Sequence, residues 1–300
     1  MPEEESPEPG PSGPSKIFAP GLLEGQVVLI SGAGSGIGRV TAFELAGLGA
    51  TVVGCGRRIE PLEEAAALAR EAGGTFEAIA CDIRDESAVA EMVAGICERH
   101  GRVDTLVNNA GGQFLSPAEA ISAKGFRTVT ELNVQGTWNM THAVAGACWI
   151  PGEATAPGIE PAGGKVISIT LSPHNGMPGM VHSGAARAAV ENMMKTLSIE
   201  WSRFGIRLNA VAPGQIATHT LKTKYPAKMV DTMEETIPLG RLGEPEEMAW
   251  LIAYLASPAG DFFSGTVLTI DGGRDNWFGT WPPQFQAGEG GEPPAEERRR

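Results

Sequence analysis

Apolar residues along this chain fall in short runs that alternate with longer amphipathic stretches from Gln26 onward. The short runs are rich in Val, Ile and Leu and have the length of buried strands. The longer stretches have the length and pattern of helices. The pattern predicts strands at 27–31, 51–55, 75–81, 103–107, 165–170, 206–211 and 267–270, and helices at 36–48, 60–71, 86–99, 123–149, 182–203 and 244–256.

Alternation of strand with helix is typical of βαβ units, which form a parallel sheet with helices on both faces. Seven strands in one uninterrupted rhythm predict a single doubly wound α/β domain of the Rossmann type over 21–281. Two connections are unusually long. The Pro-, Gly- and Ala-rich segment 151–164 is expected to be an exposed excursion. The segment 213–239 follows the sixth strand at the carboxyl edge of the sheet, where we expect a substrate lid.

The two ends of the chain differ from this rhythm. Residues 1–20 begin with glutamates among prolines and start with no apolar run, which predicts a disordered leader and argues against a secretory signal peptide. Residues 282–300 are rich in Pro, Gly and Glu and end in three arginines, which predicts a disordered tail. An oligomer contact stays open as an alternative role for that tail.

Composition narrows the classes of partner. A net charge of −13 argues against nucleic acid, and no run of about 18 apolar residues indicates a membrane span. The five histidines show no metal-ligand spacing, so no metal site is predicted. None of the four cysteines is in CxxC spacing, and we expect buried thiols in a reducing cytoplasm. The cysteines are Cys55, Cys81, Cys97 and Cys148.

A glycine-rich string occupies residues 31–38, directly after the first strand and at the start of a helix. Glycines in this context permit a tight turn, close approach of the backbone to a pyrophosphate, and packing of the helix on the sheet. An NAD enzyme would place a carboxylate at the end of the second strand, but this chain has Gly56 followed by Arg57 and Arg58. Two guanidinium groups suit a 2′-phosphate, so the sequence favours NADP(H) over NAD(H).

Further motifs follow in chain order. They are Asp82-Ile83, Asn108-Asn109-Ala110-Gly111, Leu132-Asn133-Val134, Pro213-Gly214-Gln215-Ile216-Ala217-Thr218 and Ile270-Asp271-Gly272-Gly273. Together with the glycine spacing they span 26–273 and resemble the short-chain dehydrogenase/reductase superfamily. The resemblance implies that Asp82 contacts adenine, that Asn133 belongs to the catalytic set, and that 213–218 holds the nicotinamide carboxamide. The implied cofactor-binding residues are Gly32, Ser35, Gly36, Ile37, Gly38, Arg57, Arg58, Asp82, Ile83, Asn109, Ala110, Gly111, Arg187, Pro213, Gly214, Ile216 and Thr218.

The helix from His182 departs from that family at its active-site positions. The superfamily carries Tyr and, four residues later, Lys, but this chain carries Ser183 and Arg187. In the family the lysine lowers the tyrosine pKa from about 10 towards working pH, so that the tyrosine transfers the substrate proton. A serine hydroxyl ionises too weakly for that role, and arginine stays protonated. Arg187 is still suited to holding the nicotinamide ribose.

Several other residues are candidates for the missing chemistry. Thr170 or Ser172, at the end of the fifth strand, can supply the family's active-site hydroxyl, and the alignment does not decide between them. Of the two tyrosines, Tyr254 is expected on a packed helix face and Tyr225 in the predicted lid. Glu191 and Lys195 are spaced for a surface or interface pair.

The substituted helix resembles one branch of the superfamily, the trans-2-enoyl-CoA reductases and their bacterial relatives. The related 2,4-dienoyl-CoA reductases also have serine in place of tyrosine, but they keep the lysine and recruit a second tyrosine where this chain has Ser172. Reduction of an enoyl thioester leaves an enolate, which needs hydrogen-bond donors at its oxygen more than a strong acid. The sequence therefore predicts an NADPH-dependent reductase of an acyl-CoA-like 2-enoyl or dienoyl thioester in fatty acid metabolism, with hydride transfer to the β-carbon. Asn133, Thr170, Ser172, Ser183 and Arg187 form the predicted catalytic set.

Two alternatives stay open. The first is a carbonyl or alcohol oxidoreductase whose proton relay uses water or Tyr225, since some bacterial relatives resemble terpenoid-alcohol dehydrogenases. The second is a dinucleotide-binding protein without catalysis. Lys222, Lys224 and Lys228 of the predicted lid are candidates for contacts with CoA phosphates. Family resemblance also implies a homotetramer.

Overall fold

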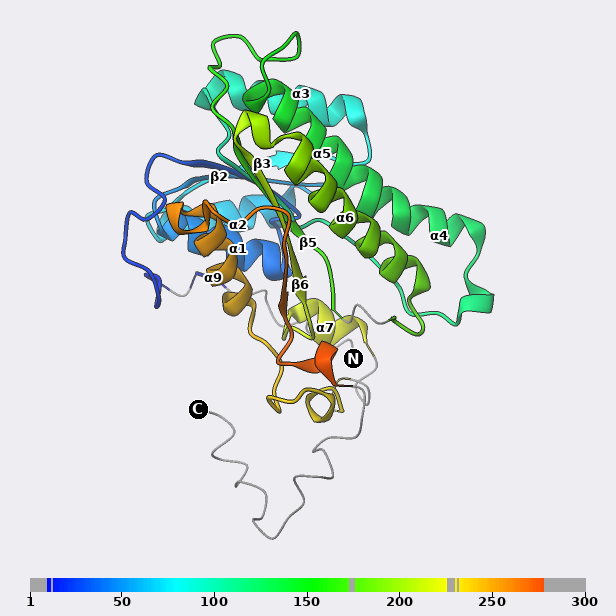
Figure 1. Ribbon diagram of the computed structural model, residues 1–300. Coiled ribbons are helices and arrows are strands. Elements are labelled where there is room, and N and C mark those ends of the chain that lie inside the picture. Colours follow the sequence, from blue (N-terminus) through cyan, green and yellow to red (C-terminus); the bar gives the residue numbers. More distant parts are fainter. Residues whose placement is uncertain (1–9, 12, 173–175, 226–229, 231, 278–300) are drawn as a thin grey trace.

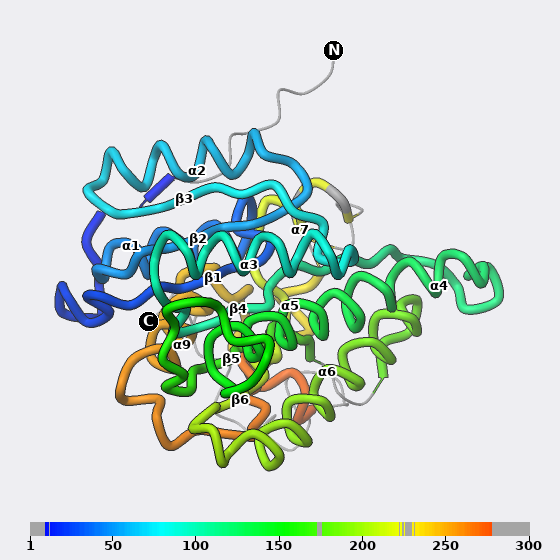
Figure 2. The backbone as a smooth tube through the Cα atoms, turned by 90° about the horizontal axis from the view of Figure 1, so that it is seen from above, coloured from blue at the N-terminus to red at the C-terminus, as the bar shows by residue number. Residues whose placement is uncertain are grey.

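The computed structural model describes residues 10–11, 13–172, 176–225, 230 and 232–277, and Figure 1 shows one central sheet with helices on both sides. The sheet has seven parallel strands in the order β3-β2-β1-β4-β5-β6-β7, which confirms the predicted doubly wound architecture. In Figure 2, seen from above, the strands follow one another from β3 to β6 in that order. The strands are β1 (Val27–Ser31), β2 (Thr51–Gly56), β3 (Thr75–Ala80), β4 (Thr105–Asn108), β5 (Gly164–Ile169), β6 (Ile206–Pro213) and β7 (Val267–Ile270).

Apart from α7, which lies in the segment predicted as a lid, the helices occupy the stretches that the sequence pattern predicts. They are α1 (Gly36–Gly47), α2 (Glu60–Glu71), α3 (Glu86–His100), α4 (Ala123–Thr130), α5 (Gly136–Val144), α6 (Val181–Glu200), α7 (His219–Lys224) and α9 (Pro245–Ala256). Short 3₁₀ turns are η1 (Ala118–Ala120), η4 (Ser202–Phe204), η5 (Glu234–Thr236), η6 (Pro258–Gly260) and η7 (Arg274–Asn276). The predicted excursion at 151–164 is confirmed: most of it is exposed, and it forms no helix or strand before Gly164.

Each face of the sheet has its own core because successive strand residues point to opposite sides. On β1, Val28 and Ile30 pack with α1, α2 and α9, whereas Val27 and Leu29 pack with α3, α5 and α6. Figure 1 shows these two helix layers on either side of the strands. The cysteines are all buried and free, as expected.

The predicted helix at 123–149 is divided into four parts. The α-helical segments α4 and α5 each continue into a wider π-helical turn, η2 (Glu131–Gln135) and η3 (Ala145–Trp149). Both Figure 1 and Figure 2 show α4 projecting from the body of the molecule. A π-turn inserts an extra residue into a helix and often occurs at a functional site. Here the first π-turn carries Asn133.

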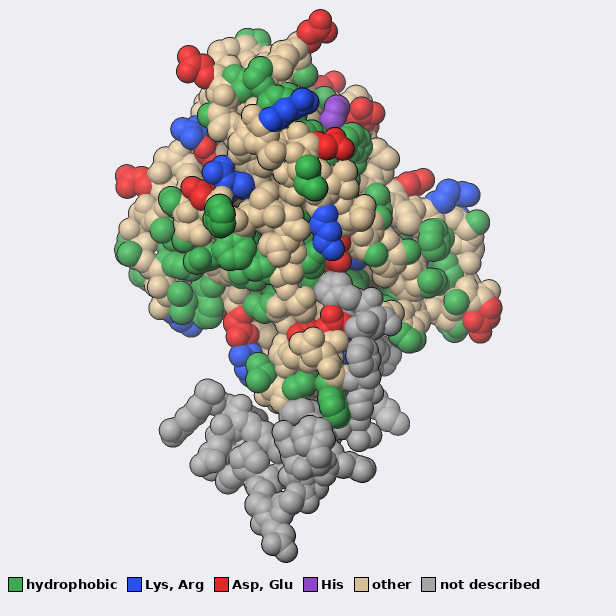
Figure 3. All heavy atoms as spheres, viewed as in Figure 1, with side chains coloured by type: hydrophobic (Ala, Val, Ile, Leu, Met, Phe, Trp, Pro, Cys, Tyr) green, Lys and Arg blue, Asp and Glu red, His purple; other side chains and the backbone are tan. Residues whose placement is uncertain are grey.

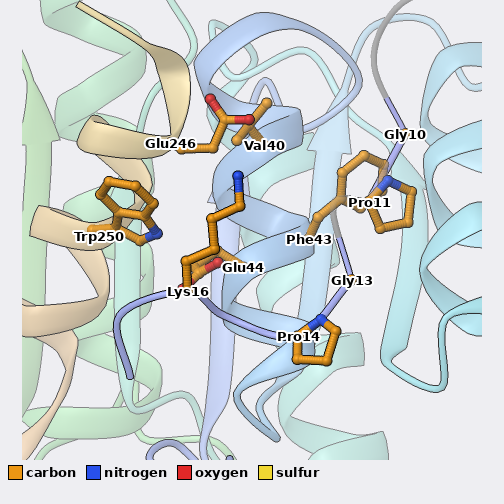
Figure 4. A pocket seen from close by; sticks show the side chains of 10 residues that line it. All are labelled: Gly10, Pro11, Gly13, Pro14, Lys16, Val40, Phe43, Glu44, Glu246 and Trp250. Atoms are coloured by element: carbon orange, nitrogen blue, oxygen red, sulfur yellow. The ribbon is translucent and has the colours of Figure 1, made fainter. Parts of the chain in front are cut away.

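The described part of the predicted leader, 10–11 and 13–20, passes along α1 and α9. Figure 4 shows Pro11, Pro14 and Lys16 beside Phe43 of α1 and Trp250 of α9, around a pocket of only about 30 Å³. That volume holds about one water molecule. The pocket is therefore too small to be the functional site of this fold. Residues 1–9, 12 and the predicted tail 282–300 lie outside the described residues.

The face of the molecule drawn in Figure 3 carries no concentrated patch of one charge. Figure 3 shows acidic and basic side chains scattered over one face, with apolar side chains gathered over the region of α1 and α9. Among the described helices, none combines the length and hydropathy that crossing a membrane requires. The described residues also contain no group of three His, Cys, Asp or Glu side chains placed to hold a metal ion.

Candidate active site

A cleft of about 1220 Å³ opens at the carboxyl ends of the strands, where the loops after β1, β2, β4, β5 and β6 meet. This is the place where doubly wound sheets bind their ligands. Most of the predicted site residues line the cleft: Gly32, Ser35, Gly36, Ile37, Arg57, Arg58, Asp82, Ile83, Asn109, Ala110, Gly111, Thr170, Ser172, Arg187, Pro213, Gly214, Ile216 and Thr218. Gly38, Asn133 and Ser183 are buried immediately behind its wall.

The turn between β1 and α1 can be built only from glycine at several positions. Gly32 and Gly36 have φ of 71° and 53°, in the left-handed region that favours glycine. A Cβ atom on Gly38 would lie 2.4 Å from both the Gly32 carbonyl oxygen and Asn109 Nδ2. Asn109 Nδ2 donates to the carbonyl oxygens of Ser31 and Gly32, at 3.1 and 3.2 Å. The turn therefore presents the N-terminus of α1 to the cleft, where the helix dipole favours a phosphate.

Arginines gather where β2 and β3 end. Arg57 and Arg58 are exposed at the edge of the cleft, and no carboxylate follows the Gly56 end of β2. Arg84 Nε donates to both carboxylate oxygens of Asp82, at 2.9 and 3.2 Å. This hydrogen bond from Arg84 keeps the pKa of Asp82 below its usual value, with a smaller contribution from the charge of Arg57. Arg84 is not among the site residues predicted from the sequence. Its position two residues after Asp82 was the signal that could have indicated a contact between them.

The loop after β4 is fixed to the glycine-rich turn. Ser31 Oγ accepts hydrogen bonds from the backbone N–H groups of Asn109 and Ala110, at 3.1 and 3.0 Å. A Cβ atom on Gly111 would lie 2.2 Å from Arg187 Nη2, so the glycine leaves room for the guanidinium group. The loop therefore connects the phosphate end of the cleft to α6.

Asn133 is fully buried, and its side chain is bonded to the backbone. Nδ2 donates to the carbonyl oxygens of Gly112 and Val129, at 2.8 and 2.7 Å, and Oδ1 accepts from the Gly112 N–H at 3.3 Å. Both amide hydrogens are therefore engaged. In this structure Asn133 positions the loop around Gly112 and does not offer a donor to the cleft.

The two candidate hydroxyls at the end of β5 are also engaged. Thr170 Oγ1 donates to Glu191 at 2.9 Å, and Ser172 Oγ donates to Asp271 at 2.7 Å. The expectation that Glu191 and Lys195 form a surface or interface pair is wrong for the glutamate, because Glu191 is buried against Thr170. Both hydroxyls line the cleft while their protons are held by carboxylates.

Ser183 is fully buried, and its hydroxyl is bonded to Gln113, which lines the cleft. Ser183 Oγ donates to Gln113 Oε1 at 2.6 Å, and Gln113 Nε2 donates to the Tyr225 hydroxyl at 3.0 Å. The structure thus brings Tyr225, from the segment predicted as a lid, to the serine that replaces the family's tyrosine. Sequence reasoning missed Gln113, because no motif distinguishes this polar residue after the 108–111 string.

Arg187 reaches along the floor of the cleft between β5 and the 108–111 loop. Nη1 donates to the Ile169 carbonyl oxygen at 2.7 Å, and removal from water lowers the pKa of Arg187 to about 10. The guanidinium is therefore still charged at neutral pH. Its Nε is buried and has no partner among the described residues, which leaves one donor for a ligand.

The 213–218 loop closes the far wall of the cleft. A Cβ on Gly214 would lie 2.6 Å from Asp271 Cβ, so this loop packs closely on the turn after β7. Thr218 Oγ1 caps α7 by accepting from the Leu221 N–H at 3.2 Å. The described part of the predicted lid contains α7, Tyr225 and η5, while residues 226–229 and 231 and the side chains of Lys222 and Lys224 are outside the described set.

The residues of this cleft fit a nicotinamide dinucleotide. The glycine turn and the α1 N-terminus suit a pyrophosphate, and the unpaired Arg187 Nε suits a ribose hydroxyl. Both features line one continuous cleft, and a dinucleotide carries its nicotinamide ribose directly beside its pyrophosphate.

Comparison with known proteins agrees with the geometry. Residues 32–275 match the family model described as enoyl-(acyl carrier protein) reductase. A probable 2,4-dienoyl-CoA reductase of Bacillus subtilis is 36% identical over 87% of this chain and 100% of its own length. A probable 2,4-dienoyl-CoA reductase of Caenorhabditis elegans is 35% identical, covering 88% of this chain and 84% of the relative.

Among solved structures, the citronellol catabolism dehydrogenase of Pseudomonas aeruginosa has a TM-score of 0.75 and 42% identity, covering 86% of this chain and 98% of the other. The match runs from the glycine-rich turn past the end of β7 and so includes every wall of the cleft. The chain therefore belongs to the short-chain dehydrogenase/reductase superfamily, whose members are oxidoreductases that use a nicotinamide dinucleotide.

Proposed function

We propose that the protein is an NADPH-dependent reductase of 2-enoyl or 2,4-dienoyl thioesters of the acyl-CoA type. The observation that carries this proposal is that Ser183 and Arg187 replace the family's Tyr and Lys inside an otherwise complete cofactor cleft. The names of the relatives, 2,4-dienoyl-CoA reductases among them, support the same substrate class.

The replacement suits conjugate reduction better than ketone reduction. Reduction of a ketone produces an alkoxide that needs a proton from an acid beside it, and the Tyr–Lys pair of the family provides that acid. Reduction of a conjugated thioester produces an enolate, whose charge is spread over the thioester and is stabilised by hydrogen-bond donors. For a 2-enoyl substrate the hydride adds to the β-carbon, and for a 2,4-dienoyl substrate the same conjugation extends to the δ-carbon.

The chain's own residues hold the cofactor in this proposal. NADPH, when bound, supplies the hydride. Arg57 and Arg58 grip the 2′-phosphate, because no carboxylate at the end of β2 repels it. Arg187 holds the nicotinamide ribose through its unpaired Nε, while its bond to Ile169 fixes the guanidinium.

The substrate end of the cleft suits an acyl chain. Phe114, Leu115, Met177, Met180 and Leu221 line this end and give it apolar walls. Apolar walls with few polar groups are typical of sites for hydrophobic ligands. The lysines that the sequence suggests for CoA phosphates have side chains outside the described residues, so that contact stays a prediction, as do the homotetramer and the cytoplasmic location.

Spectrophotometric assays of NADPH oxidation test the proposal. We expect turnover with crotonyl-CoA or 2,4-hexadienoyl-CoA and none with acetoacetyl-CoA. Turnover of acetoacetyl-CoA alone would overturn the proposed function. Tight NADPH binding without turnover of any of these substrates would instead favour a dinucleotide-binding protein without catalysis.

A second candidate function rests on the likeness to the citronellol catabolism dehydrogenase. At 42% identity over nearly the whole of that chain, an alcohol oxidoreductase acting on a branched, apolar alcohol is the alternative. Reduction of NADP⁺ or NAD⁺ in the presence of citronellol separates the two functions. Oxidation of citronellol without reduction of any enoyl thioester would favour the alternative.

A further inference from the structure

A chain of hydrogen bonds connects α6 to the surface of the cleft through three side chains. Ser183 Oγ lies 2.6 Å from Gln113 Oε1, and Gln113 Nε2 lies 3.0 Å from the Tyr225 hydroxyl. Gln113 and Tyr225 both line the cleft, whereas Ser183 is completely covered. A substrate in the cleft therefore meets the tyrosine and the glutamine before it meets the serine.

The amide of Gln113 sets the direction of this chain. An amide oxygen only accepts and an amide nitrogen only donates, so Ser183 gives its proton to Gln113 and Tyr225 receives one from it. The Ser183 hydroxyl proton is therefore already hydrogen-bonded to Gln113. The Tyr225 oxygen already accepts the hydrogen bond from Gln113. Its own O–H group is therefore the donor at the end of this series of hydrogen bonds.

Among the described residues, the Tyr225 O–H group has only a weak acceptor. Its contact is Met180 Sδ at 3.9 Å, and a thioether is a poor acceptor that a substrate oxygen or carbanion readily replaces. Tyr225 therefore has a proton that it can deliver to a substrate in the cleft.

Apart from Arg187, the described side-chain donors of the predicted catalytic set are bound elsewhere. Thr170 donates to Glu191 and Ser172 donates to Asp271, and both amide hydrogens of Asn133 bond to backbone carbonyls. The backbone around Gln113 is held firmly, because Asn133 clamps Gly112. The geometry thus fixes Gln113 in place and leaves Tyr225 as the donor among these residues.

We propose that Tyr225 is the catalytic acid of this enzyme and that Gln113 is the residue that positions it. The proposal rests on the reductive function above. After hydride from NADPH has formed the new C–H bond and left an enolate and NADP⁺, the Tyr225 O–H bond breaks and its proton forms a C–H bond at the α-carbon. The phenolate is held by the Gln113 N–H and regains a proton from water.

The decisive variant is Tyr225→Phe, with Tyr254→Phe as its matched control. Tyr254 is the chain's other tyrosine and lies on α9 against Phe263, away from the cleft. With crotonyl-CoA, Tyr225→Phe is expected to lower kcat by about 100-fold or more, the usual size of a general-acid contribution. The NADPH Kd is expected to stay unchanged, and Tyr254→Phe is expected to keep the wild-type kcat.

The fate of the proton gives a readout that a structural role would not change. In D₂O, wild-type enzyme is expected to place deuterium on one face of the α-carbon, because a fixed acid delivers it. Tyr225→Phe is expected to lose this preference, since water then supplies the deuteron. Gln113→Leu, which keeps the tyrosine but removes its support, is expected to lower kcat by about 10-fold, roughly the strength of one hydrogen bond.

The outcomes that would overturn the assignment are separable from failure of the proposed function. A Tyr225→Phe variant with wild-type kcat, or with retained facial selectivity, would overturn it, and so would loss of NADPH binding in that variant. If the wild-type enzyme reduces only a carbonyl substrate, the proposed function fails. The same variants measured on that carbonyl substrate then still decide whether Tyr225 supplies the proton.

Discussion

The cofactor end and the substrate end of the cleft are both held by partly buried hydrogen bonds, but the bonds differ in kind. At the cofactor end, side chains bond to backbone: Asn109 to the carbonyls of Ser31 and Gly32, and Ser31 to the N–H of Asn109. At the substrate end, side chains bond to side chains, as in the pair formed by Ser183 and Gln113. A backbone group is present whichever residue carries it, so the cofactor end depends on particular side chains at fixed positions. At the substrate end both partners are side chains, so two residues can be exchanged together.

The cofactor end should fail most severely when its backbone packing is broken. Gly38→Ala places a Cβ 2.4 Å from a backbone oxygen, and overpacking of this kind costs about 3 kcal/mol of unfolding free energy. We expect the variant to lose measurable NADPH binding as the turn is displaced. Denaturant unfolding and fluorescence titration with NADPH measure the two effects.

Gly47→Ala on the same helix is the matched control for that substitution. No atom lies within 4 Å of a Cβ at Gly47, so the exchange should stabilise the helix by about 0.5–1 kcal/mol and leave NADPH binding intact. Equal losses in both variants would show that the close approach at Gly38 is not what the turn depends on.

Asn133 lies at the junction of the two ends and should show an intermediate effect. Asn133→Ala leaves the buried carbonyls of Gly112 and Val129 without their donors, which should lower the unfolding free energy by about 2 kcal/mol. Because the loop to Gln113 loosens, kcat should fall more than NADPH affinity. Thermal unfolding and steady-state kinetics test this, with exposed Asn192→Ala on α6 as the control. A loss of NADPH affinity with unchanged kcat would place Asn133 in the cofactor end alone.

The same contrast explains what the sequence could predict. The parallel, doubly wound sheet and the position of the glycine-rich turn could be predicted from apolar alternation and glycine spacing, because both patterns are visible within a few neighbouring residues. The substrate end did not follow in the same way. Gln113 and Tyr225 are 112 positions apart in sequence, and no local pattern indicates that an amide at one meets a hydroxyl at the other. The engagement of Thr170 by Glu191 was likewise invisible, because it requires β5 and α6 to be packed together.

Replacing two residues of the substrate end together tests whether this end accepts a paired exchange. Ser183→Tyr with Arg187→Lys restores the family's pattern and is expected to give acetoacetyl-CoA reduction if the rest of the pocket is poised for it. Because Gln113 occupies the space in front of Ser183, we expect the gain to be larger when Gln113→Ala is added. No gain in either variant would mean that the shape of the pocket, and not the acid, selects the reaction.

The arginines at the end of β2 should affect affinity without affecting the fold, because both are exposed. Arg57→Ala or Arg58→Ala removes a charged hydrogen bond to a phosphate, so the NADPH Kd should rise by about 10-fold. The NADH Kd should stay constant, and so should the melting temperature. Titrations with both cofactors measure this, and a wild-type Kd for NADH equal to that for NADPH would remove the role given to these arginines.

The smallest effect is expected at the Asp82–Arg84 pair, where a side-chain bond lies at the surface of the cofactor end. Both side chains are about one-third exposed, so Arg84→Ala should cost no more than about 0.5–1 kcal/mol of unfolding free energy at pH 7. Arg84 lowers the pKa of Asp82 in the folded protein. The pair therefore stabilises the fold fully at pH values above about 3.9, the pKa of an unfolded aspartate. This stabilisation is lost as the pH falls through the lower pKa of the folded state. Denaturation of wild type and variant should therefore differ at pH 7 and converge at acidic pH, with exposed Arg127→Ala unchanged at both. A difference that persisted in acid would mean that Arg84 acts through packing and not through the carboxylate.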